Sequence, residues 1–276
     1  MKNSTKPLVL LFLILVLGGT IYFALKTREP HVSHPRPHIL NDTTPVIFIH
    51  GSGGNETNMI PFAKQLNKKI TQDDILKIKV KKDGTLEYLS ELGQNPQYPS
   101  VFIGYEEPEA PIQSWAAGLA AVVDSLDSIY HFKSYKLVGF SNGGLAGAYY
   151  IESSLSEKYK KDITHLALLG SPFNDLDPIT DETLVNLTSE NSYFKQFSDV
   201  KDGVPKTLKV LSIAGDNQQG TLSDGTVPIS SAYGSRIIFK GAVGLYQEKT
   251  ISASHGELIS PENSPLITEV ANFLEK

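Results

Sequence analysis

The chain has 276 residues, of which 40% are hydrophobic, enough to build one large α/β domain or two small ones. Its net charge of −5 is mild and gives no electrostatic support for nucleic-acid binding. The absence of cysteine excludes disulfides, thiolate metal sites and lipid attachment through an N-terminal cysteine.

The N-terminus carries an uncharged, mostly apolar run at residues 7–25, which follows Lys2 and Lys6. A membrane-spanning helix needs roughly 20 such residues, so we predict an anchor at residues 1–26. A cleaved signal peptide is the alternative, although residues 18–20 (Gly-Gly-Thr) match a small-residue cleavage site poorly. In both cases the main domain is expected outside the cell, either anchored at the membrane or secreted.

Residues 27–44 are interrupted by prolines and contain few apolar residues, which predicts a linker. The main domain is then expected at 45–276. It opens with an apolar run at 45–49, which predicts a buried strand. The glycine-rich turn at 50–54 follows, but it has neither Gly-Lys-Ser/Thr nor the spacing of a dinucleotide-binding loop.

The remainder of the domain alternates predicted strands with predicted helices. A hairpin is predicted over 76–90, where alternating runs flank Asp83-Gly84. Further strands are predicted at 99–105, 136–140, 164–169, 208–214, 236–240 and 246–251. Helices are predicted at 57–69, 113–130, 145–159 and 265–275. This alternation favours an α/β fold in which a mostly parallel sheet is covered by helices on both faces.

One long segment, residues 174–205, interrupts the alternation. It is rich in Asp, Asn, Thr and Ser and lacks a strong hydrophobic period. Long segments of this kind in compact domains are typically lids or mobile loops. We therefore predict a small cap or lid insert, with Phe194 and Phe197 among the residues of its inward face.

The motif Gly139-Phe140-Ser141-Asn142-Gly143 stands between a predicted strand and a predicted helix. In this context Gly-x-Ser-x-Gly indicates a nucleophile elbow, which raises the serine hydroxyl above the sheet. The start of the following helix points unpaired N–H groups at the place where an oxyanion would form. We predict Ser141 as the nucleophile and the backbone N–H of Asn142 as one oxyanion donor.

A second oxyanion N–H in such enzymes comes from a glycine-rich loop after an earlier strand. The loop that contains His50, Gly51, Ser52 and Gly53 has this place in the chain. The backbone N–H of Ser52 is therefore the predicted second donor. His50 is expected to be a structural, hydrogen-bonded residue of the supporting loop and not a base.

A serine hydroxyl needs a base to take its proton, and the base needs an acid to hold its tautomer. With an elbow of this type the chain order is serine, acid, histidine. Only two histidines follow Ser141, namely His165 and His255. His165 lies near the start of a predicted strand and so at the wrong end of the sheet, which leaves His255 as the predicted base.

Two aspartates compete for the role of the acid. Asp216 directly follows a predicted strand, whereas Asp224 begins an Asp-x-x-Val-Pro sequence in the loop beyond it. A loop of this kind can turn the carboxylate toward the histidine, so Asp224 is preferred. Asp216 remains the alternative acid and would otherwise brace its turn.

Four motifs thus occur in order at domain-scale spacing, at residues 50–55, 139–144, 223–228 and 254–258. Over about residues 42–276 the chain resembles the α/β-hydrolase superfamily. More narrowly, it is similar to the uncharacterised branch of cell-surface hydrolases found in lactobacilli and related Gram-positive bacteria. The resemblance implies serine hydrolase activity. Phe140 and Asn142 depart from the His and the Met or Gln of many relatives, which affects substrate preference more than catalysis.

Together these residues predict an esterase that acts on a small-molecule or acyl-ester substrate through an acyl-enzyme. No metal or cofactor is required for this chemistry. An acyltransferase, a thioesterase or a peptidase on the same fold is the first alternative. A non-catalytic surface binding protein is the second, although a retired site should have lost Ser141, His255 or Asp224.

Overall fold

The computed structural model describes Pro35, Pro37, Leu40 and residues 43–160, 162–176, 192–199 and 203–276. The predicted anchor and most of the predicted linker lie outside these described residues. Among the residues that are described, no helix is long and apolar enough to cross a membrane.

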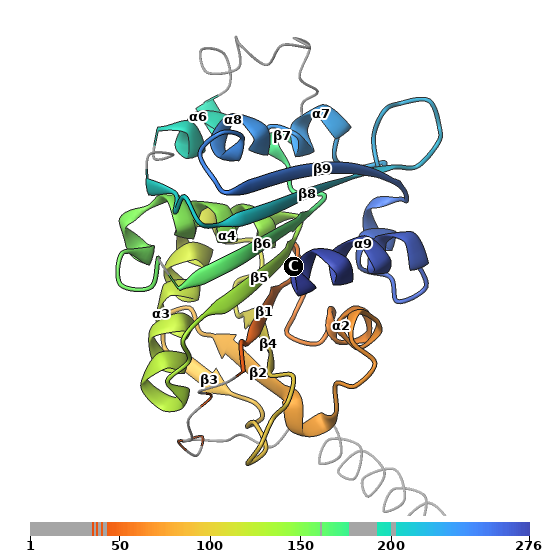
Figure 1. Ribbon diagram of the computed structural model, residues 1–276. Helices are drawn as coiled ribbons and strands as arrows, with labels where there is room; N and C mark the ends of the chain where they lie inside the picture. The colour runs from red at the N-terminus through yellow and green to blue at the C-terminus, as the bar shows by residue number, and fades with distance from the viewer. Residues whose placement is uncertain are drawn as a thin grey trace, which may run out of the picture.

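In the described part of the chain, eight strands form one sheet in the order β3-β2-β4-β1-β5-β6-β8-β9 (Figure 1). All neighbouring strands are parallel except β2 and β3, which form the predicted hairpin. The strands are β1 (Val46–Ile49), β2 (Ile75–Val80), β3 (Leu86–Tyr88), β4 (Ser100–Tyr105), β5 (Tyr135–Phe140), β6 (Ile163–Leu169), β8 (Lys209–Asp216) and β9 (Leu245–Ser252). The predicted mostly parallel α/β architecture is confirmed.

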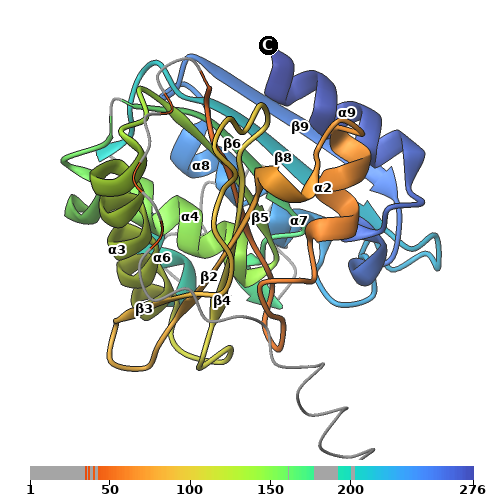
Figure 2. The ribbon, with the colours of Figure 1, turned by 90° about the horizontal axis from the view of Figure 1, so that it is seen from below.

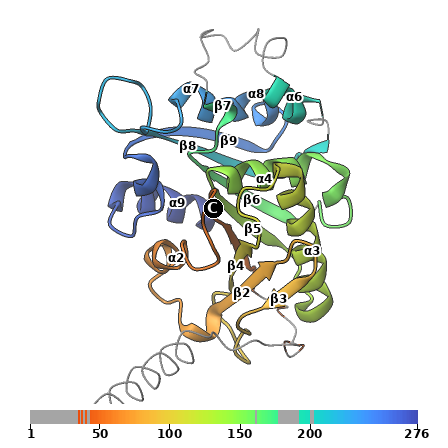
Figure 3. The same cartoon turned by 180° about the vertical axis from the view of Figure 1, so that it is seen from behind.

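Helices cover both faces of this sheet (Figures 2 and 3). The helices are α2 (Ile60–Leu66), α3 (Ile112–Tyr130), α4 (Asn142–Glu152), α6 (Ser192–Ser198), α7 (Ile229–Ala232), α8 (Ser235–Phe239) and α9 (Ser264–Glu275). Short 3₁₀ turns lie at Gln72–Asp74, Ser154–Ser156 and His255–Ile259. α3, α4, α6 and α8 contribute to one apolar cluster, and α2 and α9 contribute to another.

The two clusters follow from the alternation of side chains along each strand. In β1, Ile47 and Ile49 belong to the cluster under α3 and α4, whereas Phe48 belongs to the cluster under α2 and α9. Because both faces are covered, a central strand such as β4 is buried at every position. The parallel strands end at a common edge, and that edge carries the loops discussed below.

Residues 236–240 form most of helix α8 and not the predicted strand. The run is too short for periodicity to separate a strand from a buried helix. Ile238 and Phe239 are buried, while Arg236 on the same helix forms an ion pair with Glu248 of β9. Tertiary packing therefore decided a structure that the local sequence left ambiguous.

Two predicted helices are also shorter than expected. The helix predicted over 145–159 ends at Glu152, where Ser153 takes an extended conformation. The Ser156 hydroxyl donates to the carbonyl of Ile151 at 3.0 Å, an arrangement that competes with regular helix. The helix predicted from Thr57 begins only at Ile60, because the Thr57 N–H donates to the Asn55 side chain in a preceding turn.

The predicted cap at 174–205 is described only in part. Its beginning belongs to a short strand, β7 (Phe173–Leu176), and its later part forms α6. Phe194 and Phe197 of α6 are fully buried in the cluster that also holds α3 and α4 residues. Most of the remainder of the segment lies outside the described residues.

Glu152, the last residue of α4, is an unusual member of the interior. It is 3% exposed, and neither carboxyl oxygen has a hydrogen-bond partner among the described residues. Burial without a partner penalises the charged form and raises the pKa of Glu152 well above 4.5. The folded chain therefore keeps a proton that the unfolded chain releases above that pH.

Because the folded state binds the extra proton, the free energy of unfolding should fall as the pH rises above 4.5. Glu152→Gln imitates the protonated acid and should remove this fall. The free energy of unfolding of this variant should therefore exceed that of the wild type by an amount that grows between pH 5 and pH 8, by up to about 1.4 kcal/mol per pH unit. Urea denaturation of both proteins across this range measures the difference, with Glu157→Gln as the exposed control. An advantage that stays constant with pH would contradict a buried neutral Glu152.

Candidate active site

Ser141 lies in a strained turn between β5 and α4. Its φ of 52° and ψ of −126° are unusual for a residue with a side chain. The Ser141 N–H donates to the carbonyl of Leu169, at the end of β6, at 2.8 Å. The strained conformation is thus fixed by the neighbouring strand, as expected of a nucleophile elbow.

The glycines of this turn allow a close approach that no side chain would permit. A Cβ added to Gly139 would lie 2.4 Å from the Cα of Gly144. A Cβ added to Gly143 would lie 2.3 Å from the backbone oxygens of both Ile49 and His50. The start of α4 therefore packs directly on the end of β1.

The strand register brings the glycine-rich loop beside the elbow. Ile49 of β1 is paired with Gly139 of β5, so the residues that follow each strand are also neighbours. A Cβ added to Gly51 would lie 2.9 Å from the Cβ of Ser141. Ser52, which follows Gly51, is therefore positioned beside Ser141.

Ser52 and Asn142 approach each other across the elbow. The amide Nδ2 of Asn142 donates to the hydroxyl Oγ of Ser52 at 2.7 Å. Within the described part of the chain, the backbone N–H of neither residue donates a hydrogen bond. Both N–H groups therefore lack a partner in the described chain, as oxyanion donors must before a substrate binds.

His50 is a buried residue that holds this loop through its ring. It is 1% exposed, and its Nδ1 donates to the carbonyl of Gly51 at 2.6 Å. Its ring meets Trp115 edge-on, with 5.0 Å between ring centroids, and Tyr105 at 5.8 Å. Burial is the largest effect on its pKa and lowers it below 6.5. A neutral, buried ring held by its neighbours fits a structural role.

Asp224 and His255 form a direct pair. The Nδ1 of His255 lies 2.6 Å from Oδ2 of Asp224, and the other carboxylate oxygen accepts N–H groups of Thr226 and Val227. The carboxylate is 2% exposed and can only accept, so the His255 proton is on Nδ1. The lone pair of Nε2 is then left to act as a base.

His255 also lies next to the elbow. Its ring centroid is 4.7 Å from that of Phe140, the residue that precedes Ser141. A Cβ at Gly170, which has φ of 58°, would lie 3.3 Å from both His255 Cε1 and Asp224 Oδ2. The histidine, the acid and the elbow therefore converge on one small space at the carboxyl edge of the sheet.

The two residues that were less favoured from the sequence are placed elsewhere. The carboxylate of Asp216 accepts the N–H of Gln218 at 2.9 Å and so braces its own turn. His165 lies near the opposite end of β6, where its ring packs on Phe273. Burial there, together with nearby lysines, lowers its pKa to about 4.

Three residues of the site were missed in the sequence. Gly170 and Gly215 leave room for the acid, since a Cβ at Gly215 would lie 2.7 Å from Asp224 Cβ. Glu257 accepts the N–H and the hydroxyl of Ser254 and so fixes the turn that carries His255. The Ser-x-x-Glu spacing of this capping box was visible in the sequence, whereas the need for the two glycines depends on tertiary contacts.

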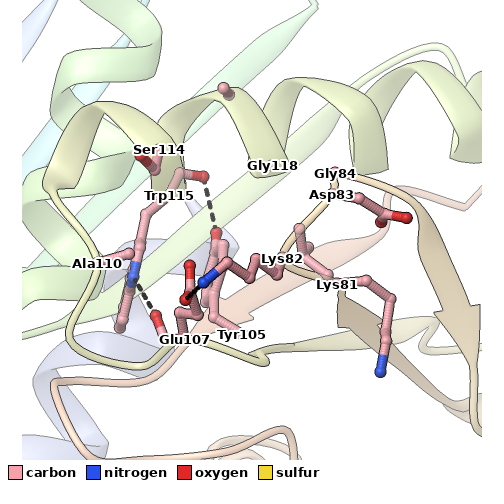
Figure 4. A pocket seen from close by; sticks show the side chains of 12 residues that line it. Lys81, Lys82, Asp83, Gly84, Tyr105, Glu107, Ala110, Ser114, Trp115 and Gly118 are labelled. Atoms are coloured by element: carbon pink, nitrogen blue, oxygen red, sulfur yellow. Dashed lines mark hydrogen bonds and ion pairs between the residues drawn. The ribbon is translucent and has the colours of Figure 1, made fainter.

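A cavity of about 300 Å³ lies between the β2–β3 hairpin and α3 (Figure 4). Tyr105 and Trp115 stack in its wall with 4.3 Å between centroids, and Lys82 bridges to Glu107 at 2.6 Å. Its lining contains none of the predicted catalytic residues, but the rings of Tyr105 and Trp115 also contact the ring of His50. Among the described residues, no cluster of His, Asp or Glu could hold a metal ion.

Comparison with known proteins agrees with this architecture. A family model described as alpha/beta hydrolase of unknown function (DUF915) matches residues 33–276. A Listeria innocua protein is 31% identical with a TM-score of 0.75, and the match covers 85% of this chain and 95% of that one. A Lactobacillus plantarum protein, proposed in its description to be a cell surface hydrolase, is 28% identical with a TM-score of 0.69, over 84% and 90% of the two chains.

More distant structures share the fold alone. An esterase from Pyrococcus furiosus is 15% identical with a TM-score of 0.52, and the match covers 84% of this chain and 81% of that chain. No curated protein matches the sequence.

The contact of α4 with the end of β1 makes a matched pair of glycine substitutions informative. Gly143→Ala should lower the free energy of unfolding by at least about 2 kcal/mol, because its Cβ meets backbone and something must shift. In Gly147→Ala, in the same helix, the added Cβ lies at ordinary contact distances from the side chains of Leu166 (3.4 Å) and Leu137 (3.8 Å), so this variant should raise the free energy of unfolding by about 0.5–1 kcal/mol through helix propensity. Urea denaturation measures both, and equal stability of the two variants would contradict the close approach.

Proposed function

Because the chain belongs to the family of alpha/beta hydrolases of unknown function (DUF915), we propose that it is a serine hydrolase that cleaves carboxylic esters. Ser141, His255 and Asp224 form its triad. The observation that carries this proposal is the 2.6 Å hydrogen bond between His255 and the buried Asp224, next to the strained turn at Ser141. A buried carboxylate that holds a histidine by Nδ1 leaves Nε2 as the base that a serine nucleophile needs.

The reaction follows from these positions. His255 takes the proton of Ser141 as the hydroxyl oxygen attacks the acyl carbonyl, and Asp224 stabilises the imidazolium that forms. The backbone N–H groups of Ser52 and Asn142 hold the oxyanion, each lowering the barrier by about 3 kcal/mol. His255 then gives the proton to the leaving alcohol, and water cleaves the acyl-enzyme by the same sequence of transfers.

An ester is the favoured substrate because an alkoxide is a better leaving group than an amine. Transfer to another acceptor, cleavage of a thioester and cleavage of a peptide use the same machinery and are the alternative reactions. A non-catalytic binding protein would have no reason to keep Asp224 buried against His255 or to maintain the strained Ser141. We further propose that the protein acts at the cell surface or outside the cell, which the apolar run at 7–25 and the description of the Lactobacillus neighbour support.

The ester proposal is tested with p-nitrophenyl esters from acetate to palmitate. The wild type should release p-nitrophenol, and Ser141→Ala and His255→Ala should each lower kcat/KM by about 10⁴-fold or more, since either loss disables the whole triad. Circular dichroism confirms that the variants fold. A wild type without activity on any chain length, or a Ser141→Ala variant with unchanged activity, would show that the proposed reaction is wrong.

The identity of the acid is tested by comparing two aspartates in the same assay. Asp224→Asn should lower kcat by roughly 10⁴-fold, because an amide can hold the wrong tautomer of His255. Asp216→Asn should stay within a few-fold of the wild type, because among the described residues its carboxylate accepts a hydrogen bond only from the Gln218 N–H of its own turn. If Asp216→Asn alone abolishes turnover in a folded protein, the assignment of Asp224 is wrong.

A further inference from the structure

Ser52 and Asn142 are joined by their side chains as well as placed together by their backbones. The hydrogen bond from Asn142 Nδ2 to Ser52 Oγ spans 2.7 Å between residues 90 positions apart. These are the same two residues whose backbone N–H groups have no partner in the described chain and are the proposed oxyanion donors. The bond therefore joins the two residues that carry the proposed backbone donors.

The chemistry of the two groups fixes the direction of this bond. An amide nitrogen carries two hydrogens and no available lone pair, so Asn142 donates and the Ser52 oxygen accepts. The Ser52 hydroxyl keeps its own proton, and no described residue accepts it. Because Ser52 is exposed, its hydroxyl can donate a hydrogen bond to water until a substrate arrives.

We infer that the Ser52 hydroxyl is a third oxyanion donor, held in its donor orientation by the side chain of Asn142. The inference rests on the proposed esterase function and adds a side-chain group to its two backbone donors. An O–H bond to a developing O⁻ is charge-assisted and roughly twice as strong as a neutral bond, so it favours the transition state over the ground state. In this role Ser52 is a catalytic residue and Asn142 is a positioning residue.

The geometry around Gly51 supports this assignment. The Cα of Gly51 approaches Ser141 so closely that an added Cβ would lie 2.9 Å from Ser141 Cβ. Ser52 is the next residue, and its chain is turned back by Gly53, which has φ of 68°. The Ser52 side chain thus lies within hydrogen-bond distance of Asn142, the residue that directly follows Ser141.

A simpler role is that the bond only ties two loops together. Under that role, removing either partner breaks the same contact, so Ser52→Ala and Asn142→Ala would have equal effects. Under the donor role, Ser52→Ala removes the catalytic proton, whereas Asn142→Ala only loosens the group that carries it. Both alanine variants keep the backbone N–H groups, so the side-chain effect is measured separately.

The experiment compares these variants on p-nitrophenyl acetate. Ser52→Ala should lower kcat by about 10- to 100-fold with KM within about threefold, less than a fully buried donor because Ser52 is exposed. Asn142→Ala should lower kcat by roughly three- to tenfold. The double variant should match Ser52→Ala, because Asn142 acts through the hydroxyl. Ser52→Thr keeps the hydroxyl and should stay within about threefold of the wild type.

Asn142→Asp provides a test that leaves Ser52 intact. A carboxylate can only accept hydrogen bonds, so the Ser52 hydroxyl should donate to it and not to the oxyanion. This variant should therefore lower kcat at least as much as Ser52→Ala does. As a second readout, a trifluoromethyl ketone forms a tetrahedral oxyanion on the nucleophile. Its inhibition constant should rise in parallel with the loss of kcat across the series, which a purely structural contact would not produce.

The outcomes separate this inference from the proposed function. A wild type with Ser141-dependent turnover and a Ser52→Ala variant within twofold of it would overturn the hydroxyl role and leave the esterase intact. Equal kcat losses in Ser52→Ala and Asn142→Ala, accompanied by equal losses of thermal stability, would reduce the bond to a structural tie and also overturn it. A wild type without Ser141-dependent turnover would overturn the proposed function and this inference with it.

Discussion

The direct packing of α4 on the ends of β1 and β5 is the constraint on which the site depends. Gly143 lies against the backbone of Ile49 and His50, and the chain can reach that position only if Ser141 accepts a positive φ. The strain is therefore imposed by the sheet and helix, as in a nucleophile elbow. The same close approach brings the loop after β1 against Ser141. A substitution at Gly143 or Gly51 would therefore disturb both the turn at Ser141 and the loop after β1.

The acid and the histidine reach the same space by a different route. β8 and β9 are parallel and paired so that Asp216 stands opposite Ser252. The loops that leave these two strands therefore start side by side, although Asp224 and His255 are 31 positions apart. Two backbone N–H groups fix the carboxylate, and the capping box at Ser254 fixes the histidine turn. The pair is thus preorganised before any substrate binds, which is the usual source of electrostatic catalysis in such sites.

Much of the fold and of the candidate site could be predicted from the sequence because each of these features has a local sequence pattern. Buried strands, the Asp-Gly hairpin and the long α3 carry clear periods, and the motifs around Ser141, Asp224 and His255 follow a chain order that one fold class shares. The failures came where tertiary contacts decide. Residues 236–240 became a helix because their apolar side pairs with the core and Arg236 reaches Glu248. The contact between Asn142 and Ser52 could not be predicted either, since it joins loops that only the sheet brings together.

If Ser141 is a nucleophile activated by its surroundings, a covalent probe for reactive serines should modify it. The wild-type protein is treated with a fluorophosphonate, digested, and analysed by mass spectrometry to locate the adduct. We expect a single adduct on the peptide that contains Ser141, absent from Ser141→Ala and strongly reduced in His255→Ala. No adduct on the folded wild type, or an adduct on another residue that persists in Ser141→Ala, would contradict it.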